Sequence, residues 1–241
     1  MRAETRHQLK TDRFTQATIG AAEATVQWTG EHKSKLIAGI GIGAIVVAAV
    51  IGGWYYLGRQ DDQANLELTK AVRTMGTQIR LAGAPETPNL PSFASAQDRA
   101  TAAKSQLQAV IDKYPHTHTA DIARYLLGTT AIELGDKATA ERELKEVASS
   151  RNSDLSALAK LAMASLYGNT NRTKEAIDLY KQLIDKPTNT VSKVMAQMQM
   201  GSLYESSQQP LEAKRIYEQI VKENPKSEAE SLAQARLQNL K

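Results

Sequence analysis

One uncharged apolar run dominates the N-terminal part of the chain. It extends from Leu36 to Leu57 and reads LIAGIGIGAIVVAAVIGGWYYL, so a helix would be apolar on every face. Such a helix rises about 33 Å, enough to cross a bilayer hydrocarbon core of roughly 30 Å. Trp54 to Tyr56, followed by Arg59, form an aromatic and cationic boundary of the kind found at headgroup depth. The pattern predicts a single transmembrane helix over residues 36–57.

A cleavable signal peptide is the main alternative to a retained anchor. Such signals have a short basic leader and an apolar region of about 7 to 15 residues. Here thirty-five residues precede a run of twenty-two, so we expect the span to be retained. A buried core helix is a weaker alternative, because the run is apolar all round and rich in glycine and alanine.

The segments on either side of the span are polar. Residues 1–35 form a tail whose thin alanine stripe allows a short helix. The juxtamembrane segment 58–80 is predicted to be helical from Asp61 or Asp62, either of which would cap the start. Its apolar positions at helical spacing are Ala64, Leu68, Val72, Met75 and Ile79. Residues 81–96 follow as an extended connector with Pro85, Pro88 and Pro91.

An internal repeat occupies residues 97–241. Four alanines are spaced by 37, 36 and 37 residues, namely Ala103, Ala140, Ala176 and Ala213. Each is followed four residues later by a large side chain, namely Leu107, Leu144, Tyr180 and Tyr217. Twelve residues before the last three alanines stand the small residues Gly128, Ala164 and Gly201. Small residues at these positions let two antiparallel helices approach closely.

This order of small, aromatic and alanine positions resembles the tetratricopeptide repeat, a helix pair of about 34 residues. No repeat here carries that family's tryptophan. An unspecialised helical bundle is the alternative, but a bundle needs only a period of about 3.6, whereas a second period near 36 favours a solenoid. The resemblance implies a tetratricopeptide-repeat-like α-solenoid. With the span predicted from the apolar run, the fold class is all-α, with an N-terminal single transmembrane helix followed by that solenoid. Residues 227–240 would be its polar-faced terminal helix.

Composition narrows the chemistry that the chain offers. The absence of cysteine excludes disulfides, thiolate metal sites and cysteine nucleophiles. The net charge of +4 comes from interspersed basic and acidic residues and does not favour nucleic acid as a partner. His116 and His118 could ligate a metal, but two histidines in a turn beside Asp121 are more typical of a solvated site. We expect no enzymatic activity, no metal and no cofactor.

Small residues recur at about four-residue intervals on one face of the predicted span, namely Gly39, Gly43, Ala44, Ala48 and Gly52. Such a face is suited to packing against another span, including that of a second copy of this chain. Glycine and alanine are also common in solitary spans. Both a homo-oligomer through the transmembrane helix and a lone helix in the lipid bilayer therefore stay open.

The resemblance to tetratricopeptide repeats also implies a binding surface. These arrays bind peptides or protein surfaces on the concave face formed by the first helix of each pair. In this chain the corresponding residues are Tyr125, Thr129, Leu161, Ser165, Met198 and Ser202. They lack the fixed donors with which chaperone-tail adaptors hold a carboxylate, so variable apolar segments suit them better. The alternative is that Leu161 and Met198 only pack against neighbouring helices.

The N-terminal tail carries six basic residues, namely Arg2, Arg6, Lys10, Arg13, Lys33 and Lys35. This favours a cytoplasmic amino terminus. The tail, the span ending GGWYYLGRQDDQAN and the exported repeat domain resemble the bacterial ancillary SecYEG translocon subunit family, which is related to periplasmic cell-division coordinators. The resemblance implies an inner-membrane scaffold whose periplasmic domain meets a SecYEG-type channel, periplasmic chaperones or nascent chains. A cell-envelope or cell-division coordinator that binds a different membrane assembly is the alternative.

Overall fold

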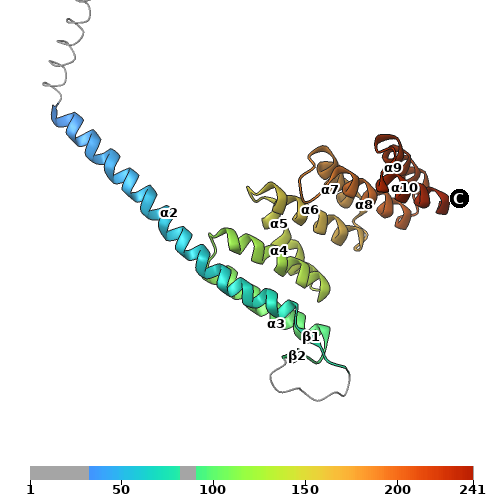
Figure 1. The fold of residues 1–241 in the computed structure, drawn as a ribbon, viewed down its shortest axis with the longest axis horizontal. Helices are drawn as coiled ribbons and strands as arrows, with labels where there is room; N and C mark the ends of the chain where they lie inside the picture. The colour runs from blue at the N-terminus through green and yellow to red at the C-terminus, as the bar shows by residue number, and fades with distance from the viewer. Residues whose placement is uncertain (1–32, 82–90, 241) are drawn as a thin grey trace, which may run out of the picture. The chain divides into compact units, whose positions relative to one another are not determined.

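The computed structural model describes residues 33–81 and 91–240 of the chain, with side chains described from residue 42 onward (Figure 1). Two compact units are present, residues 1–56 and residues 57–241. The helices are α2 (Lys33–Met75), α3 (Ala96–Lys113), α4 (His118–Glu133), α5 (Lys137–Ala148), α6 (Ser153–Gly168), α7 (Thr173–Asp185), α8 (Lys193–Ser206), α9 (Pro210–Glu223) and α10 (Glu228–Asn239). Two short strands, β1 (Gln78–Ile79) and β2 (Ser92–Phe93), pair in parallel.

Helix α2 is continuous from Lys33 to Met75, so the predicted helix start at Asp61 or Asp62 is wrong. No glycine or proline lies between Arg59 and Met75 to interrupt the helix. Asp61 does not cap its own helix, because its carboxylate accepts a hydrogen bond from the Thr119 N–H at 2.8 Å. The predicted end at residue 80 is also wrong, because Gly76 follows the last helical residue and β1 begins two residues later.

The connector after β1 is described only at its two ends. Pro85 and Pro88 lie outside the described residues, while Pro91 directly precedes β2. The Arg80 N–H donates to the Phe93 carbonyl at 2.9 Å, which extends the pairing of the two strands by one hydrogen bond. The two ends of the connector are therefore held side by side by this strand pairing.

The N-terminal part of α2 carries large apolar side chains that are exposed. From Ile42 to Leu57 these include Ile45, Val50 and Trp54, the last with 80% of its surface accessible. The helix is long and apolar enough to cross a membrane. A continuous apolar surface of this extent marks an interaction surface, and a bilayer is one environment that would cover it.

The second unit contains the predicted tetratricopeptide-repeat-like solenoid, which the structure confirms (Figure 1). Helices α3 to α10 each pack mainly on the next helix in the chain, and α4 also touches α6. The four repeat alanines and the four large residues that follow them are all buried. At the end of the array, Ala233 of α10 is buried in one cluster with Ala213, Tyr217 and Ile220 of α9. The predicted terminal helix therefore covers the last apolar edge.

The first repeat draws its first helix from the C-terminal part of α2. Ala64, Leu68 and Ala71 are buried in one cluster with Leu107 and Val110 of α3. The chain after the span is therefore the partner of α3, although the connector separates the two helices.

The turn between the two helices of each later pair has one backbone form. It places a single residue in the left-handed region, namely Gly135 (φ 74°), Asn171 (φ 60°) and Gln208 (φ 58°). The N–H of the next residue then bonds to the carbonyl five positions earlier, in the pairs Asp136 to Ala131, Arg172 to Tyr167 and Gln209 to Tyr204. This is the Schellman form of helix end, which glycine adopts at least cost.

Candidate functional site

The six predicted groove residues lie on the first helices of three successive pairs. Tyr125 and Thr129 are on α4, Leu161 and Ser165 on α6, and Met198 and Ser202 on α8. The two members of each pair are four residues apart, so they share one helix face. Ser165 is exposed and the other five are half-buried.

The three large members of this set also take part in packing. Tyr125 and Leu161 pack against the main core cluster, and Met198 packs against the cluster around Tyr217. Burial raises the pKa of Tyr125, which keeps its phenol neutral at physiological pH. Each side chain therefore has an inner part that holds neighbouring helices and an outer part that reaches the surface.

The small members differ in how they are placed. The Thr129 hydroxyl donates to the Leu126 carbonyl at 3.0 Å and so is already engaged within α4. Ser165 and Ser202, in contrast, line one hollow of about 120 Å³ between α6 and α8. Asn169 and Gln199 also line this hollow.

The surface between α6 and α8 is therefore more polar than the predicted apolar groove. Asn169 and Gln199 were not identified from the sequence. The repeat register selects Ser165 and Met198 as groove residues, and nothing in the sequence indicates that Asn169 and Gln199 lie beside them. Amide side chains offer both donors and acceptors. This part of the face is thus suited to hydrogen bonding with a peptide backbone, while Tyr125, Leu161 and Met198 supply apolar contacts.

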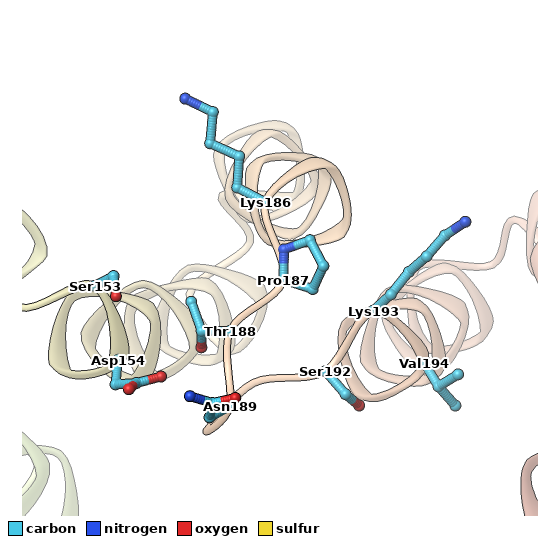
Figure 2. Close-up of a pocket in the computed structure, with 9 residues that line it drawn as sticks. All are labelled: Ser153, Asp154, Lys186, Pro187, Thr188, Asn189, Ser192, Lys193 and Val194. Carbon is cyan, nitrogen blue, oxygen red and sulfur yellow. The ribbon is translucent and has the colours of Figure 1, made fainter.

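A larger pocket of about 680 Å³ lies where the α7–α8 loop passes the start of α6 (Figure 2). The loop is held by Thr190, whose hydroxyl donates to the Asp154 carbonyl at 3.0 Å. Figure 2 shows Pro187 facing the middle of the pocket, with the Lys186 and Lys193 side chains directed away from it. Lys193 is paired with Glu223 at 2.9 Å. The charged groups of this pocket do not converge as a reaction centre would require.

A network around Arg172 joins three helices of the array. The Arg172 guanidinium lies 3.8 Å from the centre of the Tyr167 ring and bonds to Glu141 at 2.7 Å and to Glu175 at 2.6 Å. The Tyr167 hydroxyl donates to Glu141 at 2.9 Å. The hydrogen bond from Arg172 lowers the pKa of the Glu141 carboxyl. This network links α5 to α6 and to the start of α7, and so joins two successive helix pairs of the array.

The two histidines considered as metal ligands are exposed at the α3–α4 turn. His116 lies in the turn itself and His118 is the first residue of α4. Within residues 33–81 and 91–240, no three histidine or acidic side chains are grouped so that they could hold a metal ion.

The faces of α2 are described from residue 42 onward, so the side-chain surroundings of Gly39 lie outside the description. A Cβ atom added at Gly43 or Gly52 would meet no atom within 4 Å, leaving room for a close neighbour at both positions. The packing face that includes Ala44 and Ala48 stays a prediction.

Comparison with known proteins agrees with the repeat architecture. Residues 26–241 match the family described as a tetratricopeptide repeat-like domain. A comparison with curated proteins gives no significant match. A crystal structure of a tetratricopeptide repeat protein from Parabacteroides merdae ATCC 43184 is similar at 23% identity and a TM-score of 0.47, covering 60% of this chain and 54% of that one. The chain thus spans about half the length of that relative. Because the family match includes nearly all of the sequence, the chain belongs to the tetratricopeptide repeat-like domain family.

Proposed function

We propose that the chain is a membrane-anchored scaffold that binds other proteins through the face formed by α4, α6 and α8. The tetratricopeptide repeat-like fold is a protein-interaction scaffold. One observation carries the proposal: Tyr125, Leu161 and Met198 occur on successive first helices and are only half-buried. A row of partly exposed aromatic, aliphatic and thioether side chains fits apolar segments of varied sequence.

The anchor in this proposal is the N-terminal part of α2. Its exposed apolar side chains from Ile42 to Leu57 would contact lipid, with Trp54, Tyr55 and Tyr56 at the interface. The basic N-terminal tail favours a cytoplasmic amino terminus, which would place the repeat domain in the periplasm of a bacterial cell. The protein would then be a single-pass protein of the inner membrane.

For partners we propose a SecYEG-type channel, together with nascent chains that leave it or periplasmic chaperones that receive them. The support is the resemblance in layout noted above, in which a short tail and one span precede an exported repeat domain. Newly exported chains are unfolded and expose apolar segments. A face with apolar side chains and amide groups is chemically suited to hold such segments briefly.

Site-specific photo-crosslinking in intact cells tests this function. A photo-reactive amino acid replaces Tyr125 or Met198 in the full chain, and the same residue at the exposed Lys181 of α7 is the matched control. We expect channel subunits, chaperones or nascent chains to be trapped from the first two positions and not from the control. Equal products from all three positions, or none of these partners, would contradict the proposal. Midcell enrichment of the tagged protein with division proteins trapped would favour a division-site coordinator.

A second experiment tests the membrane topology separately. Protease added to spheroplasts should digest the chain beyond Arg59 while it leaves a protected N-terminal fragment. Digestion only after the inner membrane is permeabilised would place the repeat domain in the cytoplasm and would remove the periplasmic partners.

A further inference from the structure

We propose that the hollow between α6 and α8 binds a side-chain carboxamide, so that the segments held by this face carry an asparagine or glutamine near an apolar residue. This inference rests on the proposed function and sharpens it, because a row of apolar side chains alone would accept any apolar segment. The polar side chains that line the hollow support it by their depth, their free hydrogen-bonding groups and their lack of charge.

Residues from three helices form the hollow. Ser165 lies on α6, Asn169 caps the end of that helix, Gln199 and Ser202 lie on α8, and Tyr180 comes from α7. Tyr180 is only 3% exposed, whereas Ser165, Asn169 and Gln199 are exposed. Tyr180 therefore contributes to the bottom of the hollow, and the exposed residues form its rim.

The hollow is narrow because α6 and α8 approach closely at one side of it. A Cβ atom added at Gly168 would lie 2.8 Å from Leu203 Cδ1, and both residues line the hollow. Its volume of about 120 Å³ holds several water molecules or one small side chain. A peptide backbone can therefore lie on the rim, and only a side chain that projects from it reaches the level of Tyr180.

The polar side chains around the hollow are free to bind a ligand. Within residues 33–81 and 91–240, the side chains of Ser165, Asn169, Gln199 and Ser202 make no hydrogen bond to the protein, and neither does the Tyr180 hydroxyl. Burial raises the pKa of Tyr180, so its phenol stays neutral and can donate. A buried hydroxyl is unfavourable unless solvent or a ligand bonds to it. The hollow thus favours an occupant that supplies hydrogen-bonding groups at its bottom.

The charge of the hollow selects the kind of polar group. The nine described residues that line it include no acidic and no basic side chain. A carboxylate or an ammonium group that entered would lose water without gaining an opposite charge. A carboxamide is neutral and offers N–H donors together with an acceptor oxygen. It therefore matches hydroxyl and amide side chains, which can donate and accept in the same way.

The neighbouring apolar residues set the spacing that a bound segment needs. Ser165 follows Leu161 by four residues on α6, and Ser202 follows Met198 by four residues on α8. Four residues correspond to about 6 Å along a helix axis. Alternate residues of an extended chain point to one side and are about 6.6 Å apart. An extended segment along these helices would place an apolar residue against Leu161 or Met198 and the carboxamide two positions away in the hollow.

Titration of three labelled peptides tests this inference. Each is a short fluorescent peptide with leucine at alternate positions, and its central residue is asparagine, aspartate or leucine. The full chain in detergent is added to each peptide, fluorescence anisotropy gives the affinity, and detergent alone is the blank. We expect the asparagine peptide to bind about tenfold more tightly than the other two, because they leave the polar groups of the hollow unpaired or bury a charge.

Tyr180→Phe removes only the hydroxyl at the bottom of the hollow. It should weaken binding of the asparagine peptide several-fold and leave binding of the leucine peptide unchanged. The matched control is Tyr217→Phe, because Tyr217 stands at the equivalent position of the last repeat and its buried hydroxyl does not line the hollow. We expect the control to bind all three peptides as the parent does.

The three peptides also separate this inference from the proposed function. Equal binding of all three, or a preference for asparagine that survives Tyr180→Phe, would overturn the carboxamide site and leave the binding face standing. Binding of none of them would overturn the binding face, and the carboxamide site would fall with it. A preference for asparagine that is lost in Tyr180→Phe and kept in Tyr217→Phe supports both.

Discussion

Gly201 of α8 and Tyr217 of α9 approach so closely that a Cβ atom on Gly201 would lie 2.6 Å from Tyr217 Cε1. Gly128 stands in the same relation to Leu144, whose Cγ would be 2.6 Å from an added Cβ. Both distances are below normal van der Waals contact. In each pair the two helices can therefore lie this close only if the small residue is glycine, which has no Cβ atom. The small residue of the repeat thus fixes how near the second helix comes to the first, which in turn sets the position of the groove face.

Replacing Gly201 with alanine should therefore destabilise the protein. Tyr217 is fully buried, so the new methyl group must push α9 away or displace the ring inside the packed core. Overpacking of this kind costs about 1 to 3 kcal/mol, partly offset by the better helix propensity of alanine. Denaturant unfolding of the full chain in detergent measures the change.

The matched control is Gly76→Ala, where the nearest atoms to an added Cβ are backbone oxygens at an ordinary 3.7 Å. We expect the control to shift the unfolding midpoint much less than Gly201→Ala. Equal midpoints for the two variants would show that the close approach of α8 and α9 does not limit stability.

Gln208→Gly should stabilise the protein. Gln208 is exposed and adopts φ 58° in the turn between α8 and α9, a conformation that glycine takes without strain. The gain is expected to be about 1 kcal/mol, because a side chain in the left-handed region costs roughly that amount. A higher thermal midpoint of unfolding is the measurement.

The opposite substitution, Gly135→Ala in the α4–α5 turn, is the control for Gln208→Gly. Gly135 has φ 74° at the equivalent place between α4 and α5, and Gly135→Ala should lower the midpoint. A stabilising Gly135→Ala, or a destabilising Gln208→Gly, would rule out left-handed strain as the cause.

Asp136 should make stability depend on pH in the acid range. Its carboxylate accepts from Lys104 at 2.6 Å and caps α5 through the Thr139 N–H, and these bonds lower its pKa from 3.8 to about 2. A group with a lowered pKa in the folded state stabilises the fold above its unfolded value, and this contribution is lost as the pH falls through the folded value. The loss is therefore expected between about pH 4 and about pH 2.

Asp136→Asn tests this assignment. The variant should have a lower thermal midpoint than the parent at neutral pH, and the difference should shrink as the pH approaches about 2. The exposed Asp178 of α7 gives a matched control, Asp178→Asn. A difference between the parent and Asp136→Asn that stays constant down to the lowest pH would contradict the role of the Asp136 charge.

The repeat register could be predicted from the sequence because the buried alanine and the large residue four positions later recur at the same spacing in every helix pair. The left-handed turn residues follow the same spacing at 135, 171 and 208, yet only Gly135 and Asn171 are residue types that signal such a turn. Gln208 gives no local signal, and its conformation is imposed by the helices on either side. The repeat register alone identifies it.

The continuity of α2 and the polar hollow between α6 and α8 could not be predicted in the same way. Asp61 is a residue type that often caps helices, and only the position of α4 explains why its carboxylate accepts from an N–H in the first turn of α4 instead of from its own helix. Asn169 and Gln199 come together because α6 and α8 lie side by side, a long-range relationship that no spacing within either helix records.

Ser165→Trp should block partner binding without unfolding the protein. Ser165 is the one exposed member of the six predicted groove residues, so a large side chain there meets solvent on the outer face of α6 instead of the core. An indole would fill the hollow shared with Ser202 and so change the surface between α6 and α8, the helices that carry Leu161 and Met198. Photo-crosslinking from Tyr125 is expected to fall about tenfold, the scale of losing a central contact in an interface. Lys181→Trp on the exposed face of α7 should leave the crosslinks unchanged. Unaltered crosslinking in Ser165→Trp, with an unaltered thermal midpoint, would show that partners do not use the α4–α6–α8 face.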